Sequence, residues 1–194
     1  MIKLLLRKGY VVLKKQIGSF LFIFCLVVIG VLYMQSNKNP SDSVTTELNP
    51  IVKERMNQLV QQSAKKGIVV VITDGFRSTA DQDRLYERGR TASGNIVTNA
   101  KGGESYHNYG LAIDFALKPP SGNIIWDMQY DGNKNGKSDW NEVVELAKDL
   151  GFEWGGDWAQ FKDYPHLQMD FGLTLADLQN GERPAESSLT SHSN

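Results

Sequence analysis

The chain has 194 residues, of which 41% are hydrophobic and 22% are charged. This length suits one ordinary domain with appendages, and the composition excludes a wholly disordered or fibrous chain. The net charge is −1, and residues 1–15 hold five cations and no acid. Without those five cations, the rest of the chain carries a net charge of −6. This acidic balance excludes nucleic acid as a partner, because phosphate contacts need clustered cations. The single cysteine, Cys25, excludes a disulfide framework and a Cys-based zinc finger.

Residues 17–34 form an uncharged apolar run of eighteen residues. A helix of this length spans about 27 Å, close to the thickness of a bilayer core. The preceding cations predict a cytoplasmic basic segment over residues 1–16 and export of everything after the span. Two interpretations stay open. An uncleaved membrane anchor is favoured because no A-x-A-like site follows the run, and the alternative is a cleaved signal peptide that releases a secreted or wall-associated protein.

The rest of the chain divides by composition. Residues 35–49 are polar and contain Pro, Ser and Thr, which predicts a linker, and residues 184–194 are similarly biased and predict a flexible tail. The intervening residues 50–183 are enough for one real hydrophobic core. We expect this single domain to act as a monomer.

Local patterns within residues 50–183 predict helices and strands that do not alternate regularly. Residues 50–66 carry apolar side chains at helical spacing, and Gly67 ends that helix. A buried strand is predicted at 67–76, and a helix at about 79–90 is opened by Ser78 and Asp81. A Gly-rich loop at 91–105 leads to predicted strands at 109–117 and 124–130. A helix capped by Asp139 and Glu142 and ended by Gly151 follows, and then a strand at 166–171 and a short helix at 173–180. This order predicts an α+β fold with a small, mostly antiparallel sheet packed by helices.

The chemistry-bearing side chains fall on two of these strands. In the strand at 109–117 the side chains alternate, so that Asp114 lies opposite the core face among Gly and Ala residues. In the strand at 166–171, His166 also points away from the core. If the two strands are close in one sheet, these side chains share a face, and His107 enters just before the first strand. Two histidines and one carboxylate fit a catalytic zinc, which keeps its fourth position for water. Ordinary polar residues at strand ends are the alternative.

Four segments resemble a family of zinc peptidases that includes vancomycin-resistance D,D-peptidases, D-alanyl-D-alanine carboxypeptidases and phage endolysin endopeptidases. SYHNYGLAID (105–114) resembles the family's S-x-H-x-x-G-x-A-x-D motif, and DYPH (163–166) resembles its second motif. With GFRS (75–78) and GFEWGGDWAQFKDYPHLQM (151–169), the set is similar to the L-alanyl-D-glutamate endopeptidase subgroup of Gram-positive bacteria and their phages. The resemblance covers about residues 50–184.

The resemblance implies roles for individual residues. His107, Asp114 and His166 match the zinc ligands, and Asp163 matches the catalytic acid/base, where many family members have Glu. Arg77 matches the arginine of the GFRS motif and is the candidate partner for a developing oxyanion. A loop-capping carboxylate and an ordinary ion-paired arginine are the alternatives for Asp163 and Arg77.

Two more residues are candidates for substrate contact. Ser105 either orients the loop that carries His107 or contacts a substrate carboxylate. Trp158 either packs, as most aromatic side chains do, or forms a wall of the substrate cleft.

The resemblance implies an extracytoplasmic zinc endopeptidase that hydrolyses the stem peptide of peptidoglycan, at the L-Ala–D-Glu bond. A D,D-carboxypeptidase or dipeptidase with the same zinc site is the nearest alternative. A zinc-stabilised module that binds the cell wall without cleaving it is the alternative from another class.

A second metal signal lies at 131–142 (DGNKNGKSDWNE), which fits the spacing D-x-[DN]-x-[DN]-G-x₅-E of a calcium loop. The alternative is an Asn/Gly-rich turn that caps the next helix. The predicted calcium ligands are Asp131, Asn133, Asn135, the Lys137 carbonyl, Asp139 and Glu142.

Overall fold

The computed structural model describes residues 46–185, and its first helix is α2 (Pro50–Lys65). The Asn49 side chain accepts a hydrogen bond from the Ile51 backbone N–H at 2.9 Å, and Pro50 occupies the first turn, where its missing N–H costs nothing. The helix predicted at 50–66 is therefore confirmed. The buried side chains of α2 recur at helical spacing and are Ile51, Val52, Leu59 and Ser63.

The sheet has four strands in the order β1-β2-β4-β3, and its three strand pairs are antiparallel. The strands are β1 (Val70–Asp74), β2 (Ala112–Leu117), β3 (Glu153–Trp154) and β4 (His166–Gln168). The predicted α+β class with a small antiparallel sheet is confirmed.

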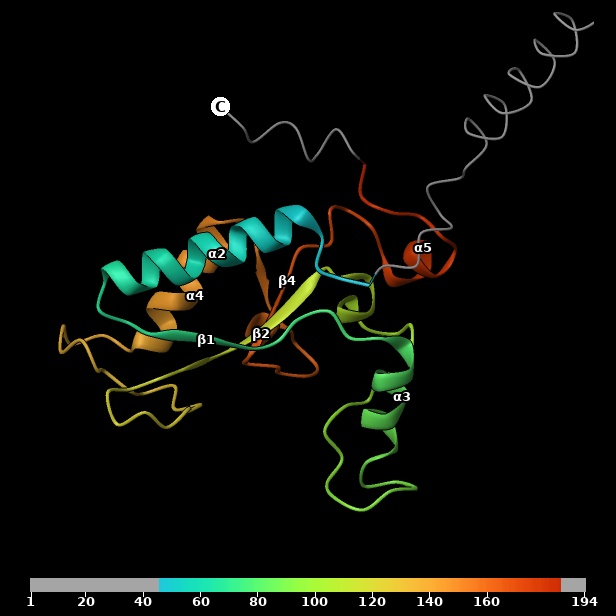
Figure 1. Cartoon of the computed structure of the whole chain (residues 1–194), viewed down its shortest axis with the longest axis horizontal. Coiled ribbons are helices and arrows are strands. Elements are labelled where there is room, and N and C mark those ends of the chain that lie inside the picture. The colour runs from blue at the N-terminus through green and yellow to red at the C-terminus, as the bar shows by residue number, and fades with distance from the viewer. Residues whose placement is uncertain (1–45, 186–194) are drawn as a thin grey trace, which may run out of the picture. The chain divides into compact units, whose positions relative to one another are not determined.

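Helices α2 and α4 (Asp139–Asp149) lie together over one face of the sheet (Figure 1). Phe115 of β2 and Trp140 of α4 are fully buried between these layers, with their ring centroids 4.4 Å apart. Because side chains alternate along β2, Ile113 and Phe115 supply the core while Asp114 faces the other way. One face of the sheet is thus used for stability, and the other is left for polar side chains.

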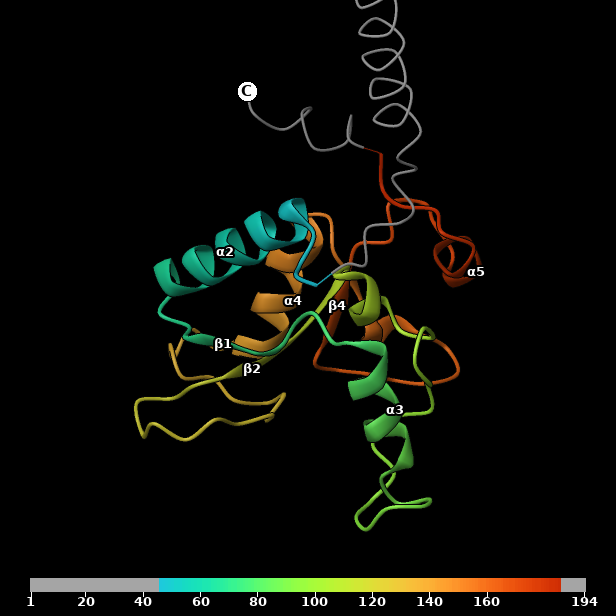
Figure 2. The ribbon, with the colours of Figure 1, turned by 45° about the vertical axis from the view of Figure 1, so that its right-hand side comes forward.

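Two shorter helices lie outside the α2–α4 layer, although Leu178 of the second one is buried in the core. Helix α3 (Thr79–Glu87) follows β1, and the Ser78 hydroxyl caps it by accepting a hydrogen bond from the Asp81 N–H at 3.1 Å, as predicted. Helix α5 (Leu175–Gln179) begins with a capping box, in which Thr174 and Asp177 each accept a hydrogen bond from the other's backbone N–H. Both views show α3 well apart from α2 (Figures 1 and 2).

The structure differs from the sequence predictions at one expected strand, one additional strand and one helix cap. Residues 124–130 form no strand, because Ile125 is their single residue in a β-bridge, which it makes with Leu117. The Asp127 carboxylate then accepts a hydrogen bond from the Gln129 N–H at 2.8 Å, which starts a turn. The two-residue strand β3 was not predicted from the sequence. The N-cap of α4 is Ser138, not Asp139, since the Asp139 carboxylate instead accepts the Gly132 N–H at 3.1 Å.

The strand predicted at 109–117 is also shorter than expected. A 3-10 helix, η2 (Tyr106–Tyr109), precedes it, and Gly110 then turns the chain with a φ of 70°. A Cβ at Gly110 would collide with the Glu47 carbonyl, so glycine is required there on two counts. The strand therefore starts at Ala112.

The N-terminal predictions lie outside the described residues. These are the basic segment 1–16, the membrane span 17–34 and most of the linker 35–49; nearly all of the predicted tail 184–194 also lies outside. Within residues 46–185 no helix combines the length and the apolar character that crossing a bilayer requires.

Candidate active site

His107 is carried by η2 and is held in place by its backbone neighbours. Its N–H donates to the Ser105 hydroxyl at 3.4 Å, and its carbonyl accepts the Arg77 N–H at 3.1 Å. The Asn108 amide donates to the Arg77 carbonyl at 2.9 Å, which ties η2 to the segment after β1. The His107 residue is only 2% exposed, so these bonds fix a buried imidazole.

Asp114 and His166 meet because β2 and β4 pair in antiparallel register. Asp114 lies directly opposite His166 in that register, with Ile113 opposite Leu167. Because both residues occupy the face away from α2 and α4, their side chains lie side by side. The shared face that the sequence predicted is confirmed.

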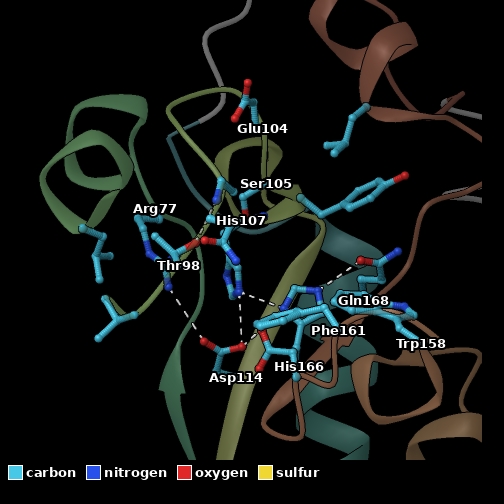
Figure 3. Close-up of a pocket in the computed structure, with 17 residues that line it drawn as sticks. Arg77, Thr98, Glu104, Ser105, His107, Asp114, Trp158, Phe161, His166 and Gln168 are labelled. Atoms are coloured by element: carbon cyan, nitrogen blue, oxygen red, sulfur yellow. Dashed lines mark hydrogen bonds and ion pairs between the residues drawn. The ribbon is translucent and has the colours of Figure 1, made fainter. Parts of the chain in front are cut away.

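The three side chains point toward one another in the close-up view (Figure 3). His107 Nε2 lies 3.2 Å from Asp114 Oδ1 and 3.2 Å from His166 Nδ1, while His166 Nδ1 lies 3.4 Å from the same carboxylate oxygen. Among residues 46–185, this trio is the one group of three or more His, Cys, Asp or Glu residues whose candidate ligand atoms all lie within 4.8 Å of one another. The trio is therefore a possible metal site.

The outward ring nitrogens identify which atoms of the histidines face the site. His107 Nδ1 lies 2.6 Å from the Gly75 carbonyl, and His166 Nε2 lies 3.0 Å from the Gln168 side-chain oxygen. Oxygens of this kind accept hydrogen bonds, so each outward nitrogen is assigned the proton and each inward nitrogen a lone pair. Two lone pairs and one carboxylate oxygen then converge, an arrangement that a bound cation stabilises.

The charge on Asp114 suits a ligand. Burial by itself raises the pKa of the Asp114 carboxyl. In the metal-free site, hydrogen bonds from His107 and His166 and their positive charge when protonated outweigh burial and hold that pKa below its usual range. Asp114 is therefore ionised at neutral pH.

Arg77 lies beside the trio and is held by fixed partners. Its guanidinium contacts Asp74 Oδ2 at 2.5 Å and donates to the Gln82 side chain at 2.7 Å, and it lies 3.8 Å from Asp114 Oδ2 (Figure 3). The fully buried Gln82 in turn donates to the Ala100 carbonyl at 2.8 Å. Arg77 is thus both ion-paired and directed at the edge of the site.

A cavity of about 660 Å³ opens over the trio. Its lining includes Arg77, Ser105, Trp158 and Asp163, the four residues that the sequence predicted beside the trio. Trp158 and Phe161 contribute apolar side chains to its walls. The Trp158 ring lies 5.2 Å from the His166 ring, and Phe161 is 53% exposed. The cavity also includes Ser105, whose hydroxyl caps η2.

Asp163 lines the same cavity and is positioned by its own backbone. Its N–H donates to the Gly155 carbonyl at 3.1 Å, and its carbonyl accepts the His166 N–H at 3.3 Å. Burial raises the pKa of the Asp163 carboxyl. The structure thus brings together the trio and the four other predicted residues Arg77, Ser105, Trp158 and Asp163.

Sequence reasoning assigned no role to several residues that support the site. Gly75 and Gln168 accept from the two histidines, and Gln82 fixes Arg77. Gln168 carried a usable signal, because it lies two residues from His166 on the same strand face. A glutamine inside a helical pattern and a glycine after a strand gave no comparable signal for the other two.

The calcium site predicted at 131–142 is not supported by the structure. The Glu142 carboxylate accepts hydrogen bonds from the Asn133 and Asn135 amides and pairs with Lys66 Nζ at 3.1 Å, and the Asp131 carboxylate accepts backbone N–H groups within its own turn. The Asp131 and Glu142 carboxylates are thus engaged by N–H donors, whereas Asp139 Oδ1 is buried without a hydrogen-bond partner. Within residues 46–185 these carboxylates do not form a group of converging metal-ligand atoms. The residues concerned are Asp131, Asn133, Asn135, Lys137, Asp139 and Glu142.

Comparisons with known proteins agree with the resemblance noted in the sequence. A family model described as D-alanyl-D-alanine carboxypeptidase matches residues 98–169. The chain is 61% identical over 150 residues to the peptidoglycan L-alanyl-D-glutamate endopeptidase CwlK of Bacillus subtilis (strain 168), which covers 77% of this chain and 90% of that protein. It is 33% identical over 119 residues to the L-alanyl-D-glutamate peptidase of Listeria phage A118, covering 61% of this chain and 37% of that one.

Among solved structures, the crystal structure of the Serratia marcescens L-Ala D-Glu endopeptidase ChiX is similar with a TM-score of 0.44 and 24% sequence identity. That match covers 71% of this chain and 89% of the Serratia chain.

Proposed function

This chain belongs to the peptidoglycan L-alanyl-D-glutamate endopeptidase family, and from that premise we propose that it is a zinc peptidase that hydrolyses the L-Ala–D-Glu bond of peptidoglycan stem peptides. The relatives from Bacillus and from the Listeria phage are both named for this bond. The trio lies beneath an open cavity, with both histidines buried and Asp114 half-buried, and this arrangement supports such a reaction.

The spacing of the three inward atoms is the observation that carries the zinc assignment. Tetrahedral zinc with bonds of about 2.0–2.1 Å holds neighbouring ligand atoms about 3.3–3.4 Å apart. The atoms of His107, Asp114 and His166 are separated by 3.2, 3.2 and 3.4 Å. Two nitrogens and one carboxylate oxygen are also a donor set that zinc takes in catalytic sites, so the residues fit this metal.

His107, Asp114 and His166 would hold the zinc ion, which would supply Lewis-acid chemistry and would lower the pKa of a bound water toward about 7. The Asp163 carboxylate, which lines the same cavity, accepts the proton of the attacking water and returns it to the leaving amine nitrogen. Arg77, fixed by Asp74 and Gln82, presents positive charge toward the oxygen of the scissile carbonyl.

Digestion of purified peptidoglycan by the zinc-loaded full-length chain tests the bond. The proposal expects products with a new amino terminus on D-glutamate, identified by mass spectrometry of the released peptides. Release of free D-alanine in their place would instead make the chain the D,D-carboxypeptidase that the family model's description suggests. Binding to the wall without any product would reduce the chain to a binding module, and the Asp163→Ala variant serves as the inactive control.

Gly155 provides a test of how closely Asp163 must be placed. A Cβ at Gly155 would lie 2.5 Å from the Asp163 carbonyl oxygen and 3.2 Å from His166 Cβ, so Gly155→Ala must displace this segment. A shift of about 1 Å in a reacting group costs on the order of 10²-fold, and we expect a loss of that size in kcat/KM. The control is Asp157→Ala in the same segment, whose exposed side chain pairs with Lys148 and does not line the cavity. Equal rates in the two variants would contradict the requirement.

We further propose that residues 17–34 anchor the chain in the cell membrane and that the peptidase domain lies outside. The supporting features are the uncharged eighteen-residue run and the five cations before it. A protease added to intact protoplasts is expected to degrade the domain. Full protection that is lost on lysis would contradict this topology.

A further inference from the structure

The two histidines of the trio turn different nitrogens toward the site. His107 presents Nε2, because its Nδ1 faces the Gly75 carbonyl at 2.6 Å. His166 presents Nδ1, because its Nε2 faces the Gln168 side-chain oxygen at 3.0 Å. The His107 acceptor belongs to the backbone, whereas the His166 acceptor is a side chain that a substitution can remove.

Gln168 is itself held in one orientation. Its amide nitrogen donates to Glu153 Oε2 at 3.1 Å, which leaves the amide oxygen directed at His166. The sheet register explains this contact, since Gln168 on β4 lies directly opposite Glu153 on β3. Gln168 is 6% exposed and His166 is 5% exposed, so water has little access to replace the bond between them.

A chain of hydrogen bonds therefore runs from an exposed carboxylate to the metal site. Glu153 orients the Gln168 amide, the amide oxygen accepts the Nε2 proton of His166, and Nδ1 is left with its lone pair facing Asp114. Metal-ligating histidines in general need such a partner on the other ring nitrogen, because it fixes both the tautomer and the ring orientation.

We propose that Gln168, held by Glu153, is a positioning residue that makes His166 bind the metal through Nδ1. This inference rests on the proposed zinc site but concerns a residue outside the ligand trio and outside the acid/base. It assigns the two-residue strand β3 a purpose in the site, because β3 carries the carboxylate that holds the glutamine.

Zinc affinity, measured by competition with a chromophoric chelator, tests the role of Gln168. Gln168→Met keeps the approximate size of the side chain but removes the acceptor, and we expect zinc binding to weaken by about 10–100-fold. The matched control is Gln160→Met, the same substitution at an exposed position. Thermal unfolding of each metal-free protein shows whether a loss is local to the site or reflects a weakened fold.

An exchange of the two side chains provides a rescue. The double variant Glu153→Gln with Gln168→Glu keeps the net charge, puts a carboxylate oxygen against His166 and puts an amide donor at the β3 position. Zinc affinity within about threefold of the wild type is expected, because an acceptor oxygen again faces His166 Nε2. A double variant that binds zinc as weakly as Gln168→Met would contradict the proposal.

Nitrogen NMR of the zinc-loaded wild-type chain, labelled at its histidines, tests the tautomer without any variant. The proposal expects His166 to carry its proton on Nε2 and to bind through Nδ1. Binding of His166 through Nε2 would overturn it, as would a Gln168→Met variant with wild-type zinc affinity. A wild-type chain that binds zinc in this way but cleaves no peptidoglycan would refute the proposed function alone.

Discussion

An Asp163→Ala variant is expected to retain its zinc and to lose about 10²–10⁴-fold in kcat, the usual contribution of a general acid–base group. Asp163 lines the cavity over the trio, but among residues 46–185 it does not belong to the group of converging candidate ligand atoms that His107, Asp114 and His166 form. Removing the carboxyl group therefore deletes the proton acceptor without deleting a ligand.

The measurement pairs the turnover of a defined stem peptide with the zinc content of the same protein sample. Asp157→Ala is the matched control, because Asp157 lies in the same segment but is exposed and pairs with Lys148 at 2.6 Å, away from the cavity. We expect this control to turn over at the wild-type rate. An Asp163→Ala variant with near wild-type turnover would remove Asp163 from the mechanism and leave it as a loop carboxylate.

The alternation of side chains along strands explains why the positions of Asp114 and His166 could be predicted from the sequence. A period of two residues fixes the face of every side chain once a strand is recognised, so Asp114 and His166 could be placed opposite the core. The same alternation assigns Ile113 and Phe115 to the core face, and both are fully buried in the structure. The third residue of the trio, His107, could be placed only as entering just before the strand, because its exact position depends on the 3-10 helix and the turn at Gly110.

Features that depend on contacts between distant segments could not be predicted from the sequence. The two residues of β3 are too few for any periodic signal, and their strand character comes from the edge of β4. The calcium spacing at 131–142 was matched letter by letter, but spacing does not reveal that Lys66, from the end of α2, pairs with Glu142. The Ser138 cap was missed because the predicted cap, Asp139, is engaged by the preceding loop.

An Asp114→Asn variant is expected to lose both zinc and activity. The amide keeps the size of the carboxylate but loses the charge, and neutral amides are poor ligands for zinc beside two imidazoles. Loss of a residue that only supports a ligand costs about 10–100-fold in metal affinity, so loss of the ligand itself should exceed 10²-fold. The peptidoglycan-cleaving activity should fall to background, since no step of the reaction proceeds without the metal.

The fold should survive this substitution, which makes the result interpretable. Arg77 keeps its 2.5 Å contact with Asp74 and its bond to Gln82, and the core on the other face of β2 is untouched. Zinc retained per chain after dialysis against a chelator is the readout, with the exposed Asp149→Asn as control. A variant that keeps one zinc under these conditions would exclude Asp114 as a ligand. The contrast with Asp163→Ala, which should keep zinc and lose turnover, separates the group that binds the metal from the group that moves the proton.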